Sequence, residues 1–418
     1  MNKLKQTYLF KLIQPLYHFL LALLGAIIYR FPSRKLHVVG ITGTKGKTTT
    51  TELVNALLEE SGLKTAIAST LRFKIGSSSE PNMFKMTMPG RFFLQKFMRD
   101  AVKEQCDTII IEMSSEGAKQ FRHRCIQMDT LIYTNLAPEH IESHGSFEKY
   151  KQAKLQIAKQ LERSWKKDKT IIVNADDEHA EDFLAINVPH KIRYSLKKVR
   201  VKRVKPFGMV ITYEGNELTT RLTGDFNASN VLAAVMYAQS RSIDMDTIKK
   251  ALINFPGVPG RVEHIKEGQP FSVIVDYAHT PDSLEQLYKA FEDFDIIAVL
   301  GNTGGGRDKW KRPAMGAIAD RYCTHITLTN EDPYDENPRE IVEQMKQGIL
   351  KTPTEIIMDR REAIHAALLR AQQRDNSSKA AVLITGKGTD PFIMGPHGSK
   401  QPWSDANVAR EELRKIIS

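Results

Sequence analysis

The segment from Leu36 to Leu57 constrains the fold more than any other part of the chain. An apolar run over 36–41 leads into a glycine-bearing turn, and a helical pattern follows at once. A strand–turn–helix unit of this kind surrounds an anion with free backbone N–H groups, so it predicts an α/β fold with a nucleoside-triphosphate site. The residues expected at this site are Gly43, Thr44, Lys45, Gly46, Lys47, Thr48 and Thr49.

The chemistry of two of these side chains makes ATP and Mg²⁺ the expected ligands. Lys47 can reach β- and γ-phosphate oxygens, and the Thr48 hydroxyl can ligate Mg²⁺. The spacing departs from the usual phosphate loop, whose first glycine would fall at Ile41. The alternative is a loop that is rich in Gly, Lys and Thr by chance.

Composition and charge narrow the class of protein. A chain of 418 residues with 41% hydrophobic and 26% charged residues is typical of a globular protein with about two or three domains. The net charge of +11 fits nucleic acid, an anionic membrane surface or an anionic substrate. The basic run 199–205 alternates with valine, as a strand with one solvated face would, and carries no aromatic residues for stacking bases, so nucleic acid is not expected.

The cysteines indicate a reducing compartment. Cys106, Cys125 and Cys323 are odd in number, far apart and outside any CxxC pattern. We therefore expect no disulfide framework and no zinc site, and we expect a cytoplasmic protein.

The N-terminal segment is unusually apolar. The run from Phe19 to Ile28 is shorter than the ~20 residues of a bilayer span, and no small-residue cleavage site of a signal peptide follows it. Three interpretations remain: a helix packed on the protein's own body, a helix within 8–31 on the membrane surface with Lys3, Lys5 and Lys11 at the headgroups, or a true span.

Apolar strand-like runs alternate with amphipathic helical patterns along most of the chain, which is typical of parallel sheets covered by helices. The expected strands include Thr108–Ile111, Thr130–Thr134, Thr170–Val173, Ser272–Val275, Ile296–Leu300, His325–Thr329 and Ala381–Thr385. Two prolines and two glycines within 256–260 break this pattern. We predict an apolar N-terminal helical segment (1–36), a phosphate-loop nucleotide-binding domain with a parallel-rich sheet (37–257) and a smaller Rossmann-like α/β domain (258–418).

Three candidate polar residues follow the early strands. Glu112 comes at the end of the strand 108–111, where a carboxylate beside a phosphate loop suits a second metal contact, although a capping glutamate fits equally. His140 and His144 have the i, i+4 spacing, which also occurs by chance. Lys154 lies on a helical pattern and by itself is typical of a surface lysine.

The ordered set of motifs resembles the Mur ligase family, and within it the UDP-N-acetylmuramoyl-tripeptide synthetase (MurE) branch. The resemblance covers about residues 37 to 410 and rests on the phosphate loop, Glu-Met-Ser-Ser (112–115), Thr-Asn-Leu-x-x-Glu-His (134–140), Tyr-x-x-Ala-Lys (150–154), Asn-Ala-Asp-Asp (174–177), Gly-Asp-Phe-Asn-Ala-Ser-Asn (224–230), Gly-Val-Pro-Gly-Arg (257–261), Asp-Tyr-Ala-His-Thr-Pro-Asp-Ser-Leu (276–284), Gly-Arg-Asp-Lys-Trp-Lys-Arg-Pro (306–313), Asp-Arg-Arg-Glu-Ala-Ile (359–364) and Gly-Lys-Gly (386–388).

The resemblance implies ATP-dependent amide-bond formation through an acyl phosphate. Carried over residue by residue, the catalytic set is Lys47, Glu112, His140, Lys154 and Arg261. Thr48 and Glu112 would hold one Mg²⁺, and His140 with a carbamoylated Lys154 would hold a second, because a carbamate supplies the oxygen ligands that Mg²⁺ prefers. Asn227, Asn230, Arg261, Asp276 and His279 would contact the nucleotide, with Arg261 sensing the γ-phosphate on domain closure; a surface salt bridge is the alternative role for Arg261.

The same resemblance implies the substrate positions. Thr87, Ser114, Gln120 and Arg122 match acceptor-binding positions, although 87–91 reads Thr-Met-Pro-Gly-Arg where the family usually has Thr-Thr-Pro-Asp-Pro. The residues implied for the incoming amine are Arg307, Asp332, Tyr334, Gly386 and Asp390. Tyr334 stands where diaminopimelate enzymes carry an arginine, and a phenol cannot form a bidentate ion pair. The amine is therefore lysine, diaminopimelate through other contacts, or another diamine.

The family usually carries an N-terminal domain that binds uridine diphosphate, whereas only residues 1–36 precede the phosphate-loop strand here. We expect a muramoyl-dipeptide acceptor and a free amino acid as substrates, a monomer, and a cytoplasmic enzyme that associates with the inner membrane face through residues 8–31. One alternative is a Mur-like ligase acting on a lipid-linked precursor, a folate or a poly-amino acid. The other is a phosphate-loop ATPase that moves or regulates a membrane partner.

Overall fold

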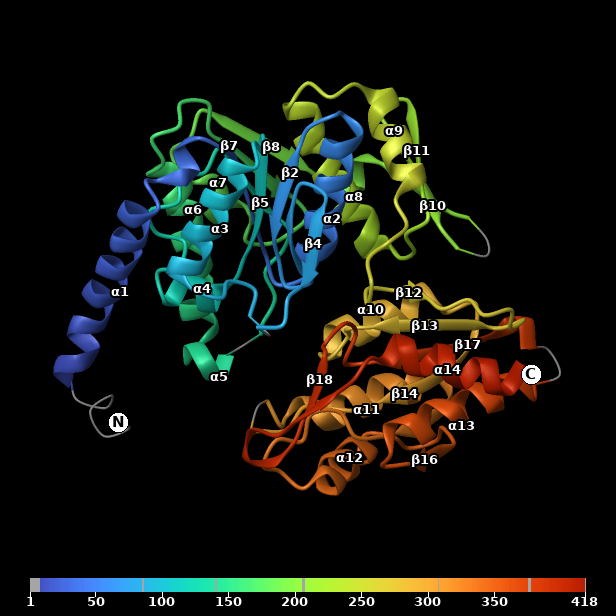
Figure 1. The fold of residues 1–418 in the computed structure, drawn as a ribbon. Coiled ribbons are helices and arrows are strands. Elements are labelled where there is room, and N and C mark those ends of the chain that lie inside the picture. Colours follow the sequence, from blue (N-terminus) through green and yellow to red (C-terminus); the bar gives the residue numbers. More distant parts are fainter. Residues whose placement is uncertain are drawn as a thin grey trace. The chain divides into compact units, whose positions relative to one another are not determined.

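The computed structural model describes residues 8–84, 86–139, 141–204, 207–306, 308–374 and 377–417. The chain divides into two compact units (Figure 1). The first comprises Met1–Arg221 and Phe226–Phe255, and the second comprises Leu222–Asp225 and Pro256–Ser418. Each unit is an α/β structure built on its own sheet, which confirms the predicted fold class.

An eight-stranded sheet in the order β4-β3-β2-β5-β1-β6-β7-β8 forms the centre of the first unit. Its strands are β1 (His37–Thr42), β2 (Thr65–Ala68), β3 (Arg72–Ile75), β4 (Ser78–Pro81), β5 (Thr108–Met113), β6 (Thr130–Tyr133), β7 (Thr170–Asn174) and β8 (His190–Tyr194). β1 pairs in parallel with β5 on one side and β6 on the other. The carboxyl ends of these three strands therefore meet at one edge of the sheet, where the ligands of such folds bind.

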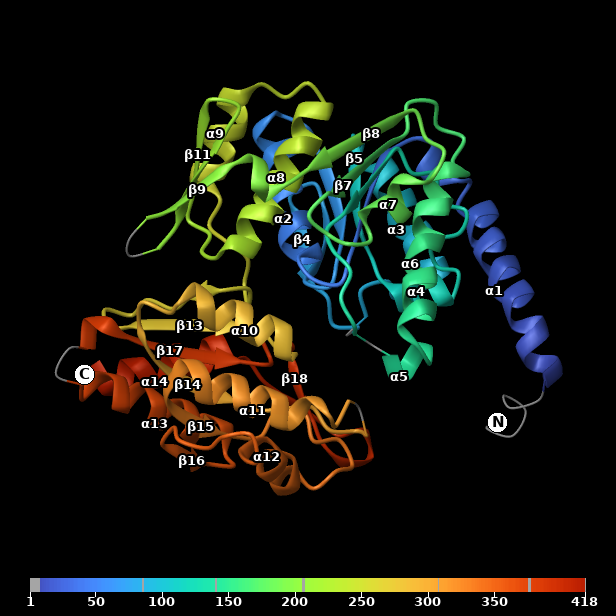
Figure 2. The same ribbon diagram turned by 180° about the vertical axis from the view of Figure 1, so that it is seen from behind.

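Helices cover both faces of this sheet (Figures 1 and 2). They are α2 (Lys47–Glu60), α3 (Arg91–Lys103), α4 (Ser115–Lys119), α5 (Ile141–His144), α6 (Phe147–Glu162), α7 (Ala180–Leu184), α8 (Asp225–Ser240) and α9 (Met245–Asn254). α3, α6 and α7 pack their apolar sides on one face, where a core of buried aliphatic and aromatic side chains forms. α2 covers the opposite face. The strands β1, β5 and β6 are thus buried on both faces, as their continuous apolar sequences require.

A three-stranded antiparallel sheet carries the basic run. Its strands are β9 (Arg200–Arg203), β10 (Met209–Tyr213) and β11 (Asn216–Thr220), in the order β11-β10-β9. β9 lies at the edge of this sheet, and its arginine and lysine side chains are exposed. The prediction of a strand with a solvated basic face is confirmed within the described residues.

The apolar N-terminal segment forms a helix, α1 (Tyr8–Ile28), that packs on α3. Ala22 and Ala26 are buried in this contact, and the Cα of Gly25 lies close enough to Phe92 that a Cβ would sit 3.7 Å away. In the described part of the chain, no helix is long and apolar enough to cross a bilayer. Packing on the protein's own body is therefore confirmed. The 3₁₀ turn η2 (Pro32–Arg34) leads from α1 into β1.

The second unit contains a six-stranded sheet in the order β12-β13-β17-β14-β15-β16, in which only β12 is antiparallel to its neighbour. Its strands are β12 (Glu263–His264), β13 (Ser272–Asp276), β14 (Asp295–Leu300), β15 (Cys323–Leu328), β16 (Thr354–Ile356) and β17 (Ala380–Thr385). The covering helices are α10 (Pro281–Ala290), α11 (Lys311–Tyr322), α12 (Pro338–Lys346), α13 (Arg360–Gln372) and α14 (Asp405–Ile417), and β18 (Phe392–Met394) pairs with β19 (Lys400–Pro402). Short 3₁₀ turns complete the two units: η3 (Leu196–Lys198), η4 (Ser377–Lys379) and η5 (Pro396–Gly398).

A buried ion pair joins four elements of the second unit. Arg360 donates from Nε and Nη2 to the two carboxylate oxygens of Asp405, over 2.8 and 2.7 Å, and both side chains are almost fully buried. The same guanidinium donates to the main-chain oxygens of Asn330 and Thr385, at the ends of β15 and β17. The 359–364 motif therefore has a structural role, since Asp359 also caps α13.

Replacing Arg360 with methionine should destabilise the protein by about 3–5 kcal/mol, because it leaves Asp405 buried without its partner. The matched control is Arg361→Met, since Arg361 is partly exposed and pairs with the exposed Glu411 and with the buried Glu412, which keeps its contacts with His365 and Lys415. The control should cost no more than about 1 kcal/mol. Urea unfolding measures both variants, and equal losses would contradict a structural role for the buried pair.

Candidate functional site

The phosphate loop joins β1 to α2 at the carboxyl edge of the eight-stranded sheet. Gly46 is the N-cap of α2 with a φ of 82°, and Gly43 has a φ of 153°. A Cβ at Gly43 would lie 1.9 Å from Thr134 Oγ1, and one at Gly46 would lie 2.2 Å from Asn230 Oδ1. Both positions therefore require glycine, and the loop leads directly into the N-terminus of α2, the kind of helix end that binds anions.

Two lysines from different helices meet at this loop. Lys47 Nζ donates to the carbonyl oxygens of Gly43 and Thr44, over 3.0 and 2.9 Å. Lys154 Nζ, from α6, donates to the same Gly43 oxygen over 2.7 Å. The structure thus brings Lys154 to the phosphate loop, and the interpretation of this residue as a surface lysine is excluded.

Lys154 is completely enclosed. Its exposed fraction is 1%, and its ammonium nitrogen lies 5.0 Å from the centre of the Tyr150 ring, whose hydroxyl bonds Thr44 Oγ1. Burial lowers the pKa of Lys154 well below its usual value, and the nearby charge of Lys47 lowers the pKa further. A lowered pKa raises the fraction of neutral amine, which is the nucleophilic form of the side chain.

Glu112 lies at the carboxyl end of β5 and links the phosphate loop to a predicted acceptor residue. Its Oε2 accepts a hydrogen bond from Thr48 Oγ1 over 3.1 Å. The carboxylate also accepts from the Thr70 N–H and hydroxyl, and Thr70 Oγ1 bonds Thr87 Oγ1 over 2.8 Å. The hydroxyl of Thr48 and the carboxylate of Glu112 are the hard oxygen donors that suit Mg²⁺, so this pair fits the metal that the phosphate loop implies.

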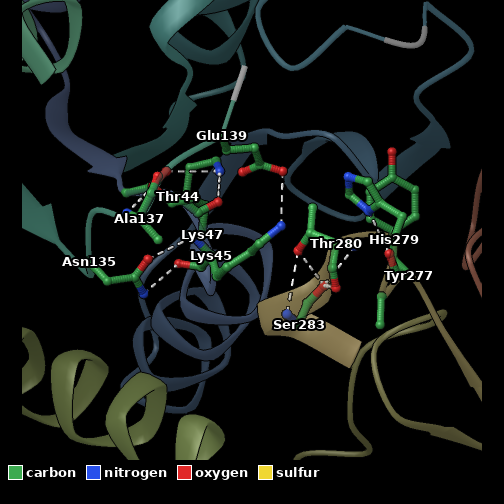
Figure 3. Close-up of polar contacts among 12 residues, drawn as sticks. Thr44, Lys45, Lys47, Asn135, Ala137, Glu139, Tyr277, His279, Thr280 and Ser283 are labelled. Carbon is green, nitrogen blue, oxygen red and sulfur yellow. Dashed lines mark hydrogen bonds and ion pairs between the residues drawn. The ribbon is translucent and has the colours of Figure 1, made fainter. Parts of the chain in front are cut away.

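The segment after β6 packs against the phosphate loop (Figure 3). Asn135 Oδ1 accepts from the Lys45 N–H over 2.9 Å, and Asn135 Nδ2 donates to the Lys45 carbonyl oxygen. Lys45 Nζ forms an ion pair with Glu139 Oε1 over 2.9 Å, and Thr44 Oγ1 accepts from the Ala137 N–H. These contacts hold the loop in place from the neighbouring strand.

Asn227 and Asn230, on α8, lie in the first unit beside α2. Asn230 Nδ2 donates to Asn227 Oδ1 over 3.1 Å, and Asn230 Oδ1 accepts from Thr50 Oγ1 over 3.4 Å. Thr49 is buried in the first turn of α2. Asn227, Asn230 and the phosphate loop with Thr49, all expected to bind the nucleotide, therefore lie together in the first unit.

The predicted acceptor residues surround the short helix α4. Ser114 is its N-cap and accepts from the Gly117 N–H, and Gln120 is its C-cap. Arg122 Nη2 donates to Gln120 Oε1 over 2.7 Å, and its Nη1 donates to the Met88 carbonyl oxygen. Because Met88 follows Thr87, the acceptor residues and the Glu112 network are connected through one segment.

In the second unit, Arg261, Asp276 and His279 gather around the end of β13. The Asp276 carboxylate accepts from the N–H groups of Val262 and Ala278, each over 2.7 Å. The Arg261 guanidinium lies 4.3 Å from the centre of the Tyr277 ring. His279 Nδ1 is hydrogen-bonded to the main-chain carbonyl oxygen of Tyr277. The Arg261 guanidinium thus contacts the face of the Tyr277 ring, and its role at the γ-phosphate stays a prediction.

A capping box follows this cluster. Thr280 is the N-cap of α10, and its Oγ1 bonds Ser283 Oγ over 2.7 Å (Figure 3). Pro281 at the first helical position agrees with this cap. The Thr-Pro-Asp-Ser motif therefore fixes the start of α10 and the direction of the chain after His279.

The residues expected to bind the amine form a buried charge network at the ends of β15 and β17. Lys387 Nζ donates to Asp332 Oδ1 and Asp390 Oδ2, over 2.8 and 3.0 Å. Asp332 Oδ1 also accepts from the Met394 N–H over 2.7 Å. Burial lowers the pKa of Lys387, but Asp332 and Asp390 outweigh it and raise the pKa overall. Asp332 and Asp390 are thus both partnered by Lys387.

Glu331 adds a buried carboxylate to this network. Its Oε2 has no hydrogen-bond partner among the described residues, and a Cβ at Gly386 would lie 2.2 Å from that atom. Burial raises the pKa of Glu331.

Tyr334 has a φ of 53°, and its N–H donates to the main-chain oxygen of Met394 over 3.0 Å. An uncommon left-handed backbone therefore sets the direction of the side chain that replaces the expected arginine.

Two predicted site residues, His140 and Arg307, lie outside the described residues. His144 is described, and its Nε2 lies 3.2 Å from Ser115 Oγ and 3.3 Å from Glu116 Oε1. The structure assembles no cluster of three or more His, Cys, Asp or Glu side chains around a metal position in the part of the chain that it describes. The three cysteines are free.

Sequence reasoning missed several residues of the site. Thr70 contacts predicted residues but lies outside every recognised motif. Glu139, Tyr150 and Lys387 lie inside recognised motifs, so their position was the available signal. Glu331 directly precedes the predicted residue Asp332. Residues brought together by sheet pairing leave no local pattern.

Comparisons with known proteins agree with this geometry. The family description "Mur ligase middle domain" matches residues 41–238, and "Mur ligase, glutamate ligase domain" matches residues 260–388. The UDP-N-acetylmuramoyl-L-alanyl-D-glutamate--2,6-diaminopimelate ligase of Bacillus cereus is 34% identical over 94% of this chain and 81% of its own length. The UDP-N-acetylmuramyl-tripeptide synthetase of a Roseiflexus species is 34% identical over 95% of this chain and 82% of its own length.

Solved structures give the same result. A structure of a UDP-N-acetylmuramoyl-L-alanyl-D-glutamate--2,6-diaminopimelate ligase is 28% identical, has a TM-score of 0.62 and covers 92% of this chain and 79% of that chain. A Mycobacterium tuberculosis folylpolyglutamate synthase complexed with ADP and AMPPCP shares the fold, with 16% identity, a TM-score of 0.67, and coverage of 88% and 92% of the two chains. With both domains matched and curated relatives above 30% identity, the chain belongs to the Mur ligase family of ATP-dependent amide-bond ligases.

Proposed function

We propose that this ligase joins a diamine-type amino acid to the free carboxylate of a UDP-linked muramoyl dipeptide. The observation that carries the proposal is the meeting of Lys47, Lys154 and the Thr48–Glu112 pair at one phosphate loop. The names of the relatives above 30% identity describe ligases that act on this kind of precursor, which supports the choice of acceptor.

The reaction has two steps. The acceptor carboxylate attacks the γ-phosphorus of ATP, the bond to the ADP oxygen breaks, and an acyl phosphate forms. The neutral amine then attacks the acyl carbon, and the tetrahedral intermediate expels inorganic phosphate and loses one proton to give the amide. Lys47 neutralises charge on the transferred group, and this positioning and neutralisation supply most of the rate. Mg²⁺, held through Thr48 and Glu112, would add charge neutralisation at the phosphate oxygens.

We further propose that Lys154 reacts with carbon dioxide through its neutral amine. The nitrogen forms a bond to carbon and releases one proton, which leaves a carbamate. Its enclosed position, its lowered pKa and its place beside the phosphate loop support this modification. A carbamate would give the site two further oxygen donors for a second Mg²⁺ together with His140.

For the amine, we propose a recognition site around Asp332, Tyr334, Gly386 and Asp390, with Arg307 and the additional residue Lys387. Lysine and diaminopimelate differ by one carboxylate, and Tyr334 supplies no cation to bind it. The relative from Bacillus cereus is named for diaminopimelate. In this chain the buried Lys387 lies between the carboxylates of Asp332 and Asp390. The amine panel described below distinguishes lysine from diaminopimelate.

The test measures phosphate release from ATP with Mg²⁺, UDP-muramoyl-L-Ala-D-Glu and a panel of amines. We expect release with one amine only, and an acceptor mass gain equal to that amino acid minus water. Release without any amine would contradict the ligase reaction on this acceptor and favour an ATPase. Release only when a lipid-linked acceptor replaces the UDP-linked one would contradict the proposed carrier.

We also propose that the enzyme is cytoplasmic and associates with the inner membrane surface through α1. Its side chains away from α3 form an exposed apolar stripe made of Leu16, Tyr17, Leu20, Leu24, Ile27 and Ile28. Directly after the helix, the Arg34 guanidinium lies 4.3 Å from the ring centre of the exposed Trp165. Tryptophan and basic residues beside an apolar stripe are typical of helices at a membrane interface. The monomeric state stays a prediction.

Co-sedimentation with phosphatidylglycerol vesicles tests this association. The double variant Leu20→Glu/Leu24→Glu should lose most binding, because both side chains are exposed and their replacement leaves the α1–α3 contact intact. Leu350→Glu is the matched control, since Leu350 is exposed in the other unit. Equal binding of the double variant and the control would contradict a role for the stripe.

A further inference from the structure

A cluster of two arginines and a histidine lies beside the acceptor residues of the first unit. Arg91 is the first residue of α3, Arg122 follows α4, and His18 lies on α1. Arg91 Nη2 donates to His18 Nδ1 and to the Gln120 carbonyl oxygen. Arg122 donates to the Gln120 side chain and to the Met88 carbonyl oxygen. Three separate elements thus converge on one position.

The positive charge of this cluster is not neutralised by the groups that it bonds. Among the described residues, the two guanidinium groups bond a histidine, main-chain carbonyls, an amide and the Met86 sulfur, none of which carries a negative charge. Arg91 Nε is buried and has no hydrogen-bond partner among the described residues. Two such cations held close together cost free energy, and a bound anion would offset that cost.

The pKa shifts agree with this geometry. Burial lowers the pKa of Arg91, and the charge of Arg122 lowers it further. Burial, Arg91 and Arg122 together lower the pKa of His18 below its usual value. The lowered pKa of His18 favours the neutral imidazole, whose Nδ1 accepts the hydrogen bond from Arg91 and holds that guanidinium in place.

The cluster is connected to the reaction centre through the segment 87–91. Thr87 bonds Thr70, which bonds Glu112 beside the phosphate loop, and the Met88 oxygen bonds Arg122. A molecule whose reacting carboxylate lies near Glu112 could therefore place a second negative group at Arg91 and Arg122. Arg91 is one of three positions within 87–91 at which this sequence departs from the usual family motif.

We propose that Arg91 joins Arg122, which the resemblance already implies for the acceptor, in binding a second oxyanion of the acceptor, and that His18 on α1 positions Arg91 in this site. The inference rests on the proposed function for the identity of the acceptor, but binding at this site requires no catalysis. A carboxylate of the dipeptide and a phosphate of its carrier share the required chemistry. Helix α1 then contributes to the acceptor site in addition to any contact with a membrane.

The experiment measures binding by calorimetry with the phosphate loop filled by a non-hydrolysable ATP analogue and Mg²⁺. The probes are L-Ala-D-Glu, the same dipeptide with its α-carboxylate amidated, and inorganic pyrophosphate. If the oxyanion is the dipeptide carboxylate, amidation weakens binding and pyrophosphate does not compete. If it is the carrier phosphate, pyrophosphate binds and amidation has no effect. Binding of neither anionic probe at this site would overturn the proposal.

Variants assign the effect to the cluster. Arg91→Gln should weaken the preferred probe, and raise the acceptor KM, by about 10-fold or more, with KM for ATP unchanged. Lys96→Gln is the matched control, because it removes one positive charge from the exposed side of the same helix. His18→Ala should give a smaller rise in acceptor KM, and His18→Gln, which keeps an acceptor atom, should restore it.

Thermal melting checks that each variant is folded, and Arg91→Lys, which keeps the charge, should show intermediate affinity. Unchanged affinity in folded Arg91→Gln, or equal rises in KM for the acceptor and ATP, would overturn the inference. The two proposals fail separately: absence of turnover with every amine contradicts the proposed reaction, whereas the calorimetric comparison still decides the binding site.

Discussion

Replacing Lys47 with glutamine should lower kcat for ligation by about 10³-fold, because one preorganised cation is lost from the transferred phosphoryl group. In the structure this ammonium is held by the Gly43 and Thr44 carbonyl oxygens at the first residue of α2. The glutamine side chain is shorter and neutral, so it can neither reach the β–γ bridge nor neutralise charge there. Phosphate release under saturating acceptor, amine and ATP measures the effect.

The control for this variant is Lys35→Gln, which removes an exposed lysine just before β1. Both proteins should melt within a few degrees of the wild type, since Lys47 lies in the loop and contributes little apolar burial. A Lys47→Gln enzyme with more than about a tenth of wild-type kcat would show that this lysine is not the principal phosphate contact.

Replacing Lys154 with methionine should lower ligation by about 10²-fold or more, and added bicarbonate should not restore it. Methionine keeps an unbranched chain in the enclosed space but cannot form a carbamate. Wild-type activity should fall in carbon dioxide-free buffer and return when bicarbonate is added. Carbon-13 NMR with labelled bicarbonate should show one carbamate signal that is absent from the variant.

Lys159→Met is the matched control, because Lys159 is exposed on the same helix, α6. It should retain wild-type activity and the carbamate signal. A wild-type enzyme that is indifferent to bicarbonate, combined with an inactive Lys154→Met, would contradict the carbamate. Lys154 would then act through its own amine at the Gly43 oxygen.

Much of the nucleotide site was predictable because its parts are local. The strand, the glycine-bearing turn and the first helical turn lie within one short segment. The structure places β1 and α2 in this segment, and each end of β1 lies one residue from its expected position. The strands β5, β6, β14 and β17 were likewise expected within one or two residues. Continuous apolar runs between polar loops determine these elements without reference to the rest of the chain.

Other parts of the site could not be predicted from local pattern. No residue near Gly46 in the sequence indicates that a Cβ at position 46 would lie 2.2 Å from Asn230 Oδ1. Arg91 appeared only within a segment that departs from a motif, and no pattern in the sequence indicated a role for His18; the packing of α1 on α3 brings the two side chains together. Arg360 belonged to a recognised motif, but its pairing with Asp405 depends on the packing of α13 and α14, which β17, β18 and β19 separate in the chain.

By itself, the sequence determined the class of fold, the phosphate loop and the chemistry of its lysine and threonine, because strand, turn and helix are specified by residues that are neighbours in the chain. Only the tertiary structure decided which side chains complete the site. Parallel pairing of β1 with β5 and β6 brings Glu112 and the loop before Lys154 to one edge, and helix packing encloses Lys154 and lowers its pKa. Burial and proximity of this kind are properties of the packed chain, so no spacing along the sequence can express them.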